Sequence, residues 1–528
     1  MKKSILLGGL LLVSIGSFAQ NTYSNAELSS SSDLIGTARY VSMGGALGAL
    51  GADISAISSN PAAIGMFRKS DFSLTAGALW PKNKDYQEDN LTHGSFDQMG
   101  FVAAFRVGGE NVQFVNFAFN YQKHFNFANG YYADNHNLRG LSQADQFASI
   151  CNTWYSGPEE LLDKSYGLLG TAGYASLLGY DKAGFYNGYG ATNNQYANYT
   201  KGSTQDFDLN LSFNSNDRYY FGFTLGCVNV DYDRYSTYTE FRPMDINAPY
   251  EDYTLYNDQH TSGFGVNIKL GTIIRPIEES PFRFGITMET PTWYSLRNTV
   301  WHSIDSKYDD KGNYLEDGYY NHAGYDDSYL EYNLRTPWRV RLSLGSTVGR
   351  SFAWGAEYEF ANYGKERMSY ETGDYYSSYT TNDVEMNRLT KNTLQGQHTA
   401  KVGFEYKPSE NWALRLGYNY ISSIYKKGAF LDSHIDSYAM DYMTSTSFMN
   451  LSGVNILTLG LGYKYKHFYA DLVYKIRNQS GDFFAFDDSF TNETQFAQDH
   501  PDFAGARLDP VNVDLTRHQI AMTLGFKF

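Results

Sequence analysis

The feature that most constrains this chain is an alternation of apolar and polar residues that recurs along nearly its whole length. In "DFDLNLSF", residues 206–213, Phe and Leu occupy one face, and Asp, Asn and Ser occupy the other. A period of two is typical of β-strands with one apolar face. It predicts fourteen strands, at residues 71–80, 98–108, 111–123, 204–213, 218–233, 259–275, 282–299, 330–347, 351–363, 395–407, 411–421, 453–465, 467–477 and 512–528.

The connections between these strands alternate strictly in length. The short ones include "GGE", "NSND", "PIEESP", "VGR" and "PSE", whereas the long ones cover residues 81–97, 124–203, 234–258, 300–329, 364–394, 422–452 and 478–511. Transmembrane barrels have short periplasmic turns and long extracellular loops, and an even number of strands. The chain is therefore predicted to be all-β, a fourteen-stranded antiparallel transmembrane β-barrel.

Aromatic residues are placed where such a barrel would need them. They make up 17% of the chain, and after the short turns the strands begin "RYYFGF", "SPFRFG", "RSFAWG", "ENWALR" and "KHFYAD". Aromatic rings prefer the level of the lipid headgroups. The last strand, "HQIAMTLGFKF", carries Phe526 and Phe528 on its apolar face. It resembles the signal that outer-membrane barrel-assembly machinery recognises, which makes that machinery an expected partner.

The first residues have the pattern of a secretory signal peptide. Lys2 and Lys3 precede an apolar run, and Ser17-Phe18-Ala19 provides a small-x-small cleavage site, so residues 1–19 are expected to be removed. No later apolar run approaches the roughly 18 residues of a membrane helix. The formal net charge of −15 argues against nucleic acid as a partner. The expected location is the outer membrane of a Gram-negative cell, with its lipids as surroundings.

Residues 20–69 precede the first strand of the predicted barrel, which spans residues 70–528. They are rich in small and apolar residues, and the turn residues Asn60-Pro61 end the stretch "GALGALGADISAISS". Side chains fill the interior of a barrel of about 8 strands, whereas 16–18 strands leave an aqueous channel. A barrel of fourteen strands therefore has an interior wide enough to hold a segment of the chain. We expect this segment to fold back into the lumen as a hatch.

At this point the residues resemble a family. "IGTARYVSMGGALGALGADISAISSNPAAIGMFRKSDFSLTAGALW", residues 35–80, resembles the hatch and first strand of FadL/TodX-type outer-membrane transporters of long-chain fatty acids and other hydrophobic compounds. The resemblance rests on the Gly/Ala-rich stretch, Asp53 and the run Asn60-Pro61-Ala62. It implies passive uptake through an extracellular apolar groove, a lumen pocket gated by the hatch, and lateral release, with those four residues in the hatch or its gate. The turn would let the hatch switch as a unit or would only anchor a permanent plug.

The insertion at residues 124–203 is predicted to be helical and extracellular. In "LSQADQFASICNTW", Phe147, Ile150 and Cys151 share a helical face and Ser142 is a suitable N-cap. In "SGPEELLDKSYGLL", Ser156 and Glu159 have the spacing of a capping box. Six leucines either form the substrate groove that the resemblance implies or pack the loop on itself: Leu161, Leu162, Leu168, Leu169, Leu177 and Leu178.

The sequence contains no recognisable catalytic or metal-binding pattern. "GALGALG" lacks the preceding strand of a dinucleotide-binding motif, and the 11 His show no HxH or HExxH spacing. The acidic residues 305–327 are predicted to be a solvated loop, with weak divalent-cation binding as the alternative. Cys151 and Cys227 are either a disulfide or two inert thiols. We therefore expect no enzyme activity, no cofactor and no metal.

Two other functions remain open from the sequence. A surface adhesin or structural barrel would use the long loops, which are rich in Tyr and Asp, and a general porin would conduct solutes through its lumen. The preferred prediction is uptake of hydrophobic small molecules or fatty acids.

Overall fold

The computed structural model describes residues 22–82, 93–109, 111–164, 167–186, 190–245, 248–307, 315, 321–374, 377–439, 442–499 and 501–528. The predicted signal peptide and much of the acidic loop at 305–327 lie outside the described residues.

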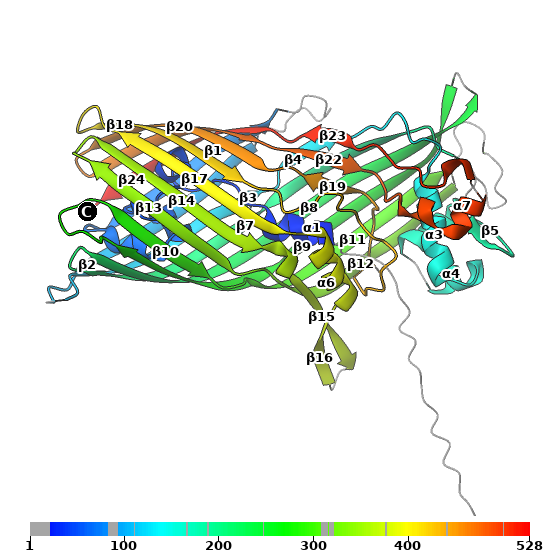
Figure 1. Ribbon diagram of the computed structural model, residues 1–528, viewed down its shortest axis with the longest axis horizontal. Coiled ribbons are helices and arrows are strands. Elements are labelled where there is room, and N and C mark those ends of the chain that lie inside the picture. The colour runs from blue at the N-terminus through cyan, green and yellow to red at the C-terminus, as the bar shows by residue number, and fades with distance from the viewer. Residues whose placement is uncertain are drawn as a thin grey trace, which may run out of the picture.

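The chain forms a closed barrel whose wall has fourteen antiparallel strand positions, as the alternation predicts (Figure 1). We call each position a stave, because two of the fourteen are each divided into two strands. The pairing of β1 with β24 closes the wall, from Asp71↔Lys527 to Pro81↔Arg517. The wall strands are β1 Asp71–Pro81, β2 His93–Arg106, β3 Phe114–Asn126, β7 Asn193–Ser215, β8 Tyr219–Asp245, β9 Ala248–Ile274, β10 Arg283–Glu289, β11 Trp293–Ser306, β12 Asn321–Arg335, β13 Arg339–Val348, β14 Phe352–Asn362, β17 Gly396–Tyr406, β18 Trp412–Ile421, β20 Val454–Tyr465, β21 Phe468–Asn478 and β24 Arg517–Lys527.

Two staves are each broken into two strands by a proline. β10 and β11 are separated at Pro291, and β12 and β13 at Pro337. Proline has no N–H to donate to a ladder. The two breaks face each other, and side chain and backbone of two threonines replace the missing ladder bonds: Thr292 N donates to Thr336 Oγ1 at 2.8 Å and Thr336 N to Thr292 O at 3.1 Å.

Several boundaries predicted from the sequence are wrong. The "loop" at 234–258 is mostly hairpin, since β8 runs to Asp245 and β9 starts at Ala248. Likewise β7 starts at Asn193, β11 runs to Ser306, and the last strand is interrupted between β23 Val511–Asp514 and β24. The stretches beyond the membrane have polar residues on both faces, so periodicity does not reveal them, although Tyr and Thr favour strands.

Smaller elements gather at the end of the barrel that carries the long connections, here called the loop end (Figure 1). They are β4 Asn129–Tyr132, α3 Gln143–Trp154, α4 Pro158–Lys164, α5 Leu168–Tyr174, β5 Gly179–Asp181, β6 Gly184–Tyr186, η3 Tyr363–Lys365, β15 Arg367–Asp374, β16 Ser377–Asn382, α6 Val384–Thr393, β19 Phe448–Leu451, β22 Ser480–Phe484, η4 Ser489–Asn492, α7 Thr494–Asp499 and η5 Pro501–Phe503. Ser142 caps α3, as predicted. The predicted capping box of the next helix is wrong, because Ser156 N donates to Glu160 instead of Glu159.

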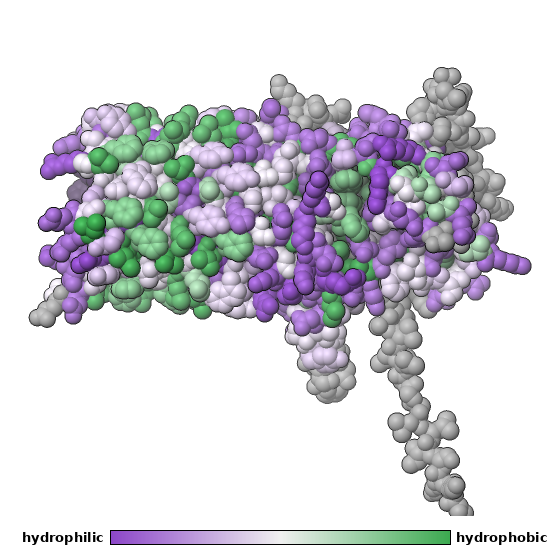
Figure 2. Space-filling view, viewed as in Figure 1, coloured by the Kyte–Doolittle hydropathy of each residue, from purple (hydrophilic) through white to green (hydrophobic). Residues whose placement is uncertain are grey.

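On the face that Figure 2 shows, an apolar belt covers the wall near the other end, here called the turn end. Leucine, isoleucine, methionine and phenylalanine side chains are exposed there on the outer face of most strands, for example Leu270, Leu342, Leu416, Leu459 and Leu524. Soluble proteins rarely expose a patch of this extent. The belt is the lipid-facing surface of a transmembrane barrel.

Aromatic side chains border the belt on both sides. At the turn end Phe526 stacks on Phe528 with ring centroids 5.8 Å apart. On the loop side His518 stacks on Trp80 and accepts or donates a hydrogen bond at 2.9 Å with the Tyr474 hydroxyl. Ten residues separate His518 from Phe528, which is about 34 Å of strand at about 3.4 Å per residue. A tilt of about 45° reduces this to roughly the 25 Å of a barrel's apolar band.

Among the described residues, no helix combines the length and the apolar character that a membrane span requires.

The N-terminal segment, residues 22–69, lies inside the barrel. It contains α1 Thr22–Ser30, α2 Ala38–Ser42, η1 Ile54–Ser58 and η2 Pro61–Met66, and most of its residues are buried. A row of cross-strand glycine neighbours makes room for it: Gly345, Gly355, Gly403 and Gly417. A Cβ on any of the last three would collide with the backbone of residues 43–46.

Deleting Phe528 should lower the folded, heat-modifiable fraction in the membrane if this residue belongs to an assembly signal. Tyr465 is the matched control, because it lies at the same end of the barrel and each of the two side chains is 54% exposed. Tyr465→Ala removes a comparable aromatic anchor without changing the last strand. Equal yields of folded protein from both variants would contradict a role in assembly.

Candidate functional site

The turn at Asn60-Pro61-Ala62 is bonded both to itself and to the wall. Asn60 Oδ1 accepts a hydrogen bond from Ala62 N at 3.0 Å and so caps η2. Asn60 Nδ2 donates to Thr272 O of β9 at 3.1 Å. On β7, Asn210 Nδ2 donates to Pro61 O at 3.2 Å. The turn therefore has fixed attachments to two wall strands.

Three wall glycines form the seat of this turn. A Cβ on Gly222 would collide with the Pro61–Ala62 peptide, and one on Gly271 or Gly285 would collide with the Asn60 side chain. Gly222 and Gly271 are direct partners across β8 and β9. The turn is thus in close van der Waals contact with bare backbone.

Asp53 closes the N-terminal segment on itself. Its carboxylate accepts hydrogen bonds from Thr37 Oγ1 at 2.7 Å and from Ser55 N at 3.0 Å. Nearby, Arg39 reaches the wall, with Nε 3.2 Å from Glu405 Oε2. Asp53 and Arg39 together hold the segment between α2 and η1 in place.

The inward face of the wall carries paired charges that the segment contacts. Arg341 lies 2.6 Å from Glu359 and 2.7 Å from Glu289, and Lys401 lies 2.6 Å from Glu357. Ser59 of the segment donates to Glu357 at 3.1 Å. Buried charges need such partners. Except for Glu357, these charged residues line a polar cavity of about 90 Å³ together with Asp33, Leu34, Ile35 and Tyr40 of the segment.

A second cavity, of about 100 Å³, lies on the loop side of the segment, and aromatic and aliphatic side chains make up about half of its lining. We call it the aromatic cavity. Its apolar lining includes Tyr23, Phe125, Phe127, Tyr131, Tyr425, Phe448, Met449, Leu451, Phe483 and Leu515. Its charged lining consists of the guanidinium groups of Arg234, Arg477 and Arg517 and the carboxyl group of Glu27, and uncharged polar residues complete it. A chamber with both an apolar and a charged part suits a ligand that has an apolar part and a polar head.

The wall is incomplete beside these cavities. In the described part of the chain, the β2–β3 ladder stops at Gln98↔Gln122, whereas β2 continues to pair with β1 and β3 with β7. Each strand carries an extra residue at this level, Asp97 in β2 and His124 in β3. Bulges of this kind bend a strand and interrupt its ladder. A side-chain bond crosses the gap, from Lys123 Nζ to Ser95 Oγ at 3.1 Å.

The six leucines of the insertion lie in or against the core of the loop end. Leu161, Leu168, Leu169 and Leu177 are at most 1% exposed and belong to one buried cluster that also contains Phe147 and Ile150. Leu162 and Leu178 are half-buried. In this arrangement the leucines pack the loop on itself, which is the alternative that the sequence left open.

The two cysteines are free thiols. Cys151 is buried in α3, and burial raises the pKa of its thiol well above the usual value. Cys227 lies in β8, in the membrane-spanning wall. The disulfide alternative is therefore wrong.

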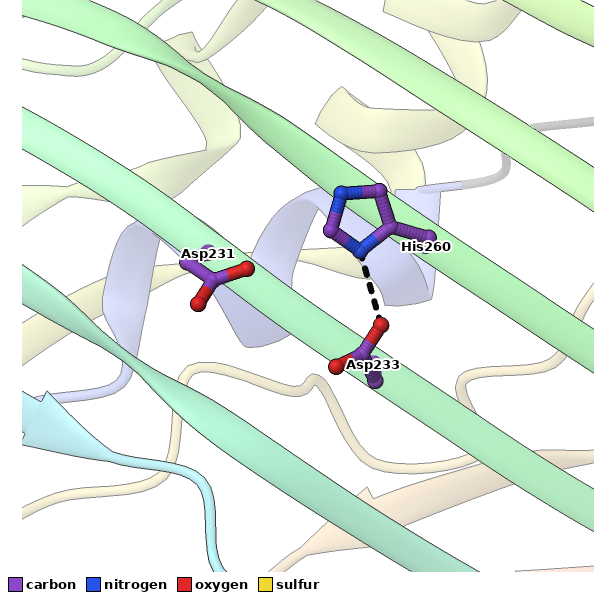
Figure 3. A group of neighbouring side chains, drawn as sticks. All are labelled: Asp231, Asp233 and His260. Atoms are coloured by element: carbon purple, nitrogen blue, oxygen red, sulfur yellow. Dashed lines mark hydrogen bonds and ion pairs between the residues drawn. The ribbon is translucent and has the colours of Figure 1, made fainter.

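A group of three possible cation ligands lies on the outer face of β8 and β9 (Figure 3). Asp233 and His260 are direct cross-strand partners, and Asp233 Oδ1 lies 2.7 Å from His260 Nδ1. Asp231 completes the group, whose ligand atoms lie within 4.8 Å of one another. Strand register creates this group, so residue spacing did not reveal it. Lys201 Nζ, 3.7 Å from Asp233, already supplies a positive charge there.

No family model matches the chain, and no curated protein matches it. Among solved structures, similar ones include a Pseudomonas aeruginosa FadL homologue, with 12% identity, 97% of this chain and 100% of that chain covered, and a TM-score of 0.49. The Ralstonia pickettii toluene transporter TbuX has 11% identity, 94% and 98% coverage and a TM-score of 0.46. The P. putida toluene transporter TodX has 11% identity, 94% and 99% coverage and a TM-score of 0.44.

Gly222→Ala should loosen the N-terminal segment, because the new Cβ collides with the Pro61–Ala62 peptide. Overpacking of this kind costs about 1–3 kcal/mol. The expected result is a higher ion conductance of the purified barrel in planar bilayers. Gly94→Ala is the control, since a Cβ there meets nothing within 4 Å. If the two variants conduct equally, the glycine seat does not hold the segment.

Proposed function

We propose that this protein lets hydrophobic compounds, long-chain fatty acids or similar molecules, cross an outer membrane by passive diffusion. The observation that carries this proposal is the aromatic cavity, whose lining residue Phe125 directly follows His124 at the gap in the wall. A barrel that only anchors loops has no use for such a chamber. The resemblance of residues 35–80 to the FadL/TodX-type hatch supports the same function.

In this proposal the N-terminal segment is a hatch that has to move. The polar cavity and the aromatic cavity measure about 90 and 100 Å³. A dry cavity of about 150 Å³ holds a benzene molecule. Neither chamber therefore accommodates a long chain while the hatch is in place. Asn60, Pro61, Ala62 and Asp53 then hold the closed state, through the attachments to β7, β9 and the segment itself.

Lateral release through the gap between β2 and β3 is the proposed exit. Lys123 and His124 line the polar cavity and also border the gap. The part of β2 that does not pair with β3 is paired on its other side with residues 76–79 of β1. It lies between the middle of the belt and the loop-side rim of the belt. A molecule leaving there would enter the apolar part of the outer leaflet. The entrance would be an apolar groove formed when the leucine-rich helices at the loop end separate.

The alternative functions make less use of these features. A general porin needs an open lumen, whereas here residues 22–69 fill the interior. An adhesin would use the extensions of β7, β8 and β9 beyond the belt, which expose tyrosines such as Tyr235 and Tyr256. That function requires neither cavity nor gap, so transport accounts for more of the structure. Assembly machinery that reads Phe526 and Phe528 completes the proposed partners.

Removing residues 20–69 while keeping the signal peptide should raise ion conductance, because the lumen loses its filling. Uptake of a labelled fatty acid by cells that carry the variant should fall, because the gate is lost. Pro61→Gly should mainly lower uptake and leave barrel heat stability nearly unchanged. If the deletion changes neither conductance nor uptake, the segment is neither plug nor gate and the adhesin function is favoured.

Bridging the gap should block uptake without emptying the lumen. The variant carries Ser95→Cys and Lys123→Cys in a chain whose native cysteines are alanine, and a reducible bifunctional thiol reagent about as long as a lysine side chain joins them. Uptake of the labelled fatty acid should fall severalfold and recover after reduction, while conductance stays constant. Each single-cysteine variant, treated identically, is the control. Uptake unaffected by the bridge would exclude this exit.

A further inference from the structure

One carboxylate of the N-terminal segment lies among three cationic side chains of the wall. Asp33 lies 2.9 Å from Lys475 Nζ, 3.4 Å from Arg517 Nη2 and 4.0 Å from Arg477 Nε. The four side chains are 3–7% exposed. We call these four residues the Asp33 cluster. It lies where the polar cavity meets the aromatic cavity.

Positive charge is in excess in this cluster. The next carboxylate, Asp97, acts on Lys475 only through space, and it accepts hydrogen bonds from Gln519 Nε2 at 2.7 Å and from Ser95. Lys123 also offsets the charge of Asp97. Arg477 Nε is buried and has no hydrogen-bond partner. Buried cations that share one carboxylate can accept a second anion.

Two of the cationic groups also line the aromatic cavity. The Phe125 ring contacts both guanidinium groups, with Arg477 Cζ 5.6 Å and Arg517 Cζ 5.0 Å from its centroid. Arg477 and Arg517 line the aromatic cavity, whereas Asp33 lines the polar cavity. The cations are therefore reached by Asp33 from one side and by the contents of the aromatic cavity from the other.

We propose that Asp33 occupies the place of a ligand carboxylate. The carboxylate head of an amphiphile binds to Arg477 and Arg517 and displaces Asp33. The aromatic cavity, too small for a long tail while the hatch is in place, takes up the apolar tail as the hatch moves. This inference rests on the proposed transport function and specifies which cargo opens the hatch. A buried cation without a partner would be strongly unfavourable. Exchanging one carboxylate for another keeps every cation of the cluster paired. A compound without a charged head group cannot replace the Asp33 carboxylate in this way.

Displacing Asp33 would loosen the hatch beside the gap. Asp33 N donates to His124 O of β3 at 3.3 Å, and Lys475 Nζ donates to Leu34 O at 3.0 Å. Both bonds depend on the position of residues 33–34. The head group would thus free the hatch at the level where the β2–β3 ladder ends.

The test compares dodecanoate with 1-dodecanol at pH 8, where the first is ionised and the second is neutral. Binding to the purified barrel is measured by calorimetry. The rate at which a water-soluble maleimide modifies Ser32→Cys, in a chain without the native cysteines, reports hatch release. Dodecanoate should bind the wild type more tightly than dodecanol and should accelerate the modification, whereas dodecanol should not.

Two variants and one control separate the exchange from general damage. Asp33→Asn removes the competing anion, and we expect it to strengthen dodecanoate binding by about tenfold, a typical coupling between two sites. Arg517→Gln should weaken dodecanoate binding and leave dodecanol binding unchanged. Arg242→Gln, in a buried ion pair with Asp252 on the β8–β9 hairpin, is the control and should alter neither.

The outcomes distinguish this inference from the proposed function. If both compounds bind equally to the wild type and both release the hatch, the Asp33 exchange is wrong but transport stands. If neither compound binds and cells take up neither, the proposed function itself is wrong. The wild-type comparison decides the inference even where a variant does not fold.

Discussion

The structure depends on closing the hydrogen-bond ladder between β1 and β24. In a bilayer every backbone N–H and C=O needs a partner within the protein, so an open sheet edge is not tolerated. The pairing runs along the whole of β1, from Asp71 to Pro81. A closed wall of fourteen staves encloses a wide interior, and the chain fills that interior with its own N-terminal segment. Everything proposed about function concerns how this filling is held and where the wall is interrupted.

The filling is held by two different kinds of contact. Glycines such as Gly222 and Gly403 let the backbone of the segment approach the wall closely, which gives shape-specific van der Waals contact. The second kind of contact involves charged groups: Arg39, the Asp33 cluster, and Glu357, which accepts a hydrogen bond from Ser59. These attachments are strong only while the charges remain paired. The first kind positions the segment, and the second kind can be exchanged for other charges. The proposed movement of the segment would require contacts that can be exchanged.

The interruption of the wall has a local cause. Asp97 and His124 are extra residues in adjacent strands at the same level, and the ladder between β2 and β3 ends there. At the same level β2 still pairs with β1, and β3 still pairs with β7. The barrel thus tolerates a gap of a few residues that side chains such as Lys123 cover.

The sequence by itself determined the barrel, the number of its staves and the sidedness of its connections, because strand alternation and loop length are local properties of the chain. It also identified the apolar N-terminal segment, the α3 helix with its Ser142 cap, and the turn at Asn60. The tertiary structure alone decided what those elements contact. Inward glycines such as Gly271 look like ordinary strand residues until the segment packs on them. The Asp33 cluster joins residues more than 440 positions apart, and the Asp233–His260 pair depends on strand register. Such contacts follow from how the barrel closes around its contents, and no local pattern records that closure.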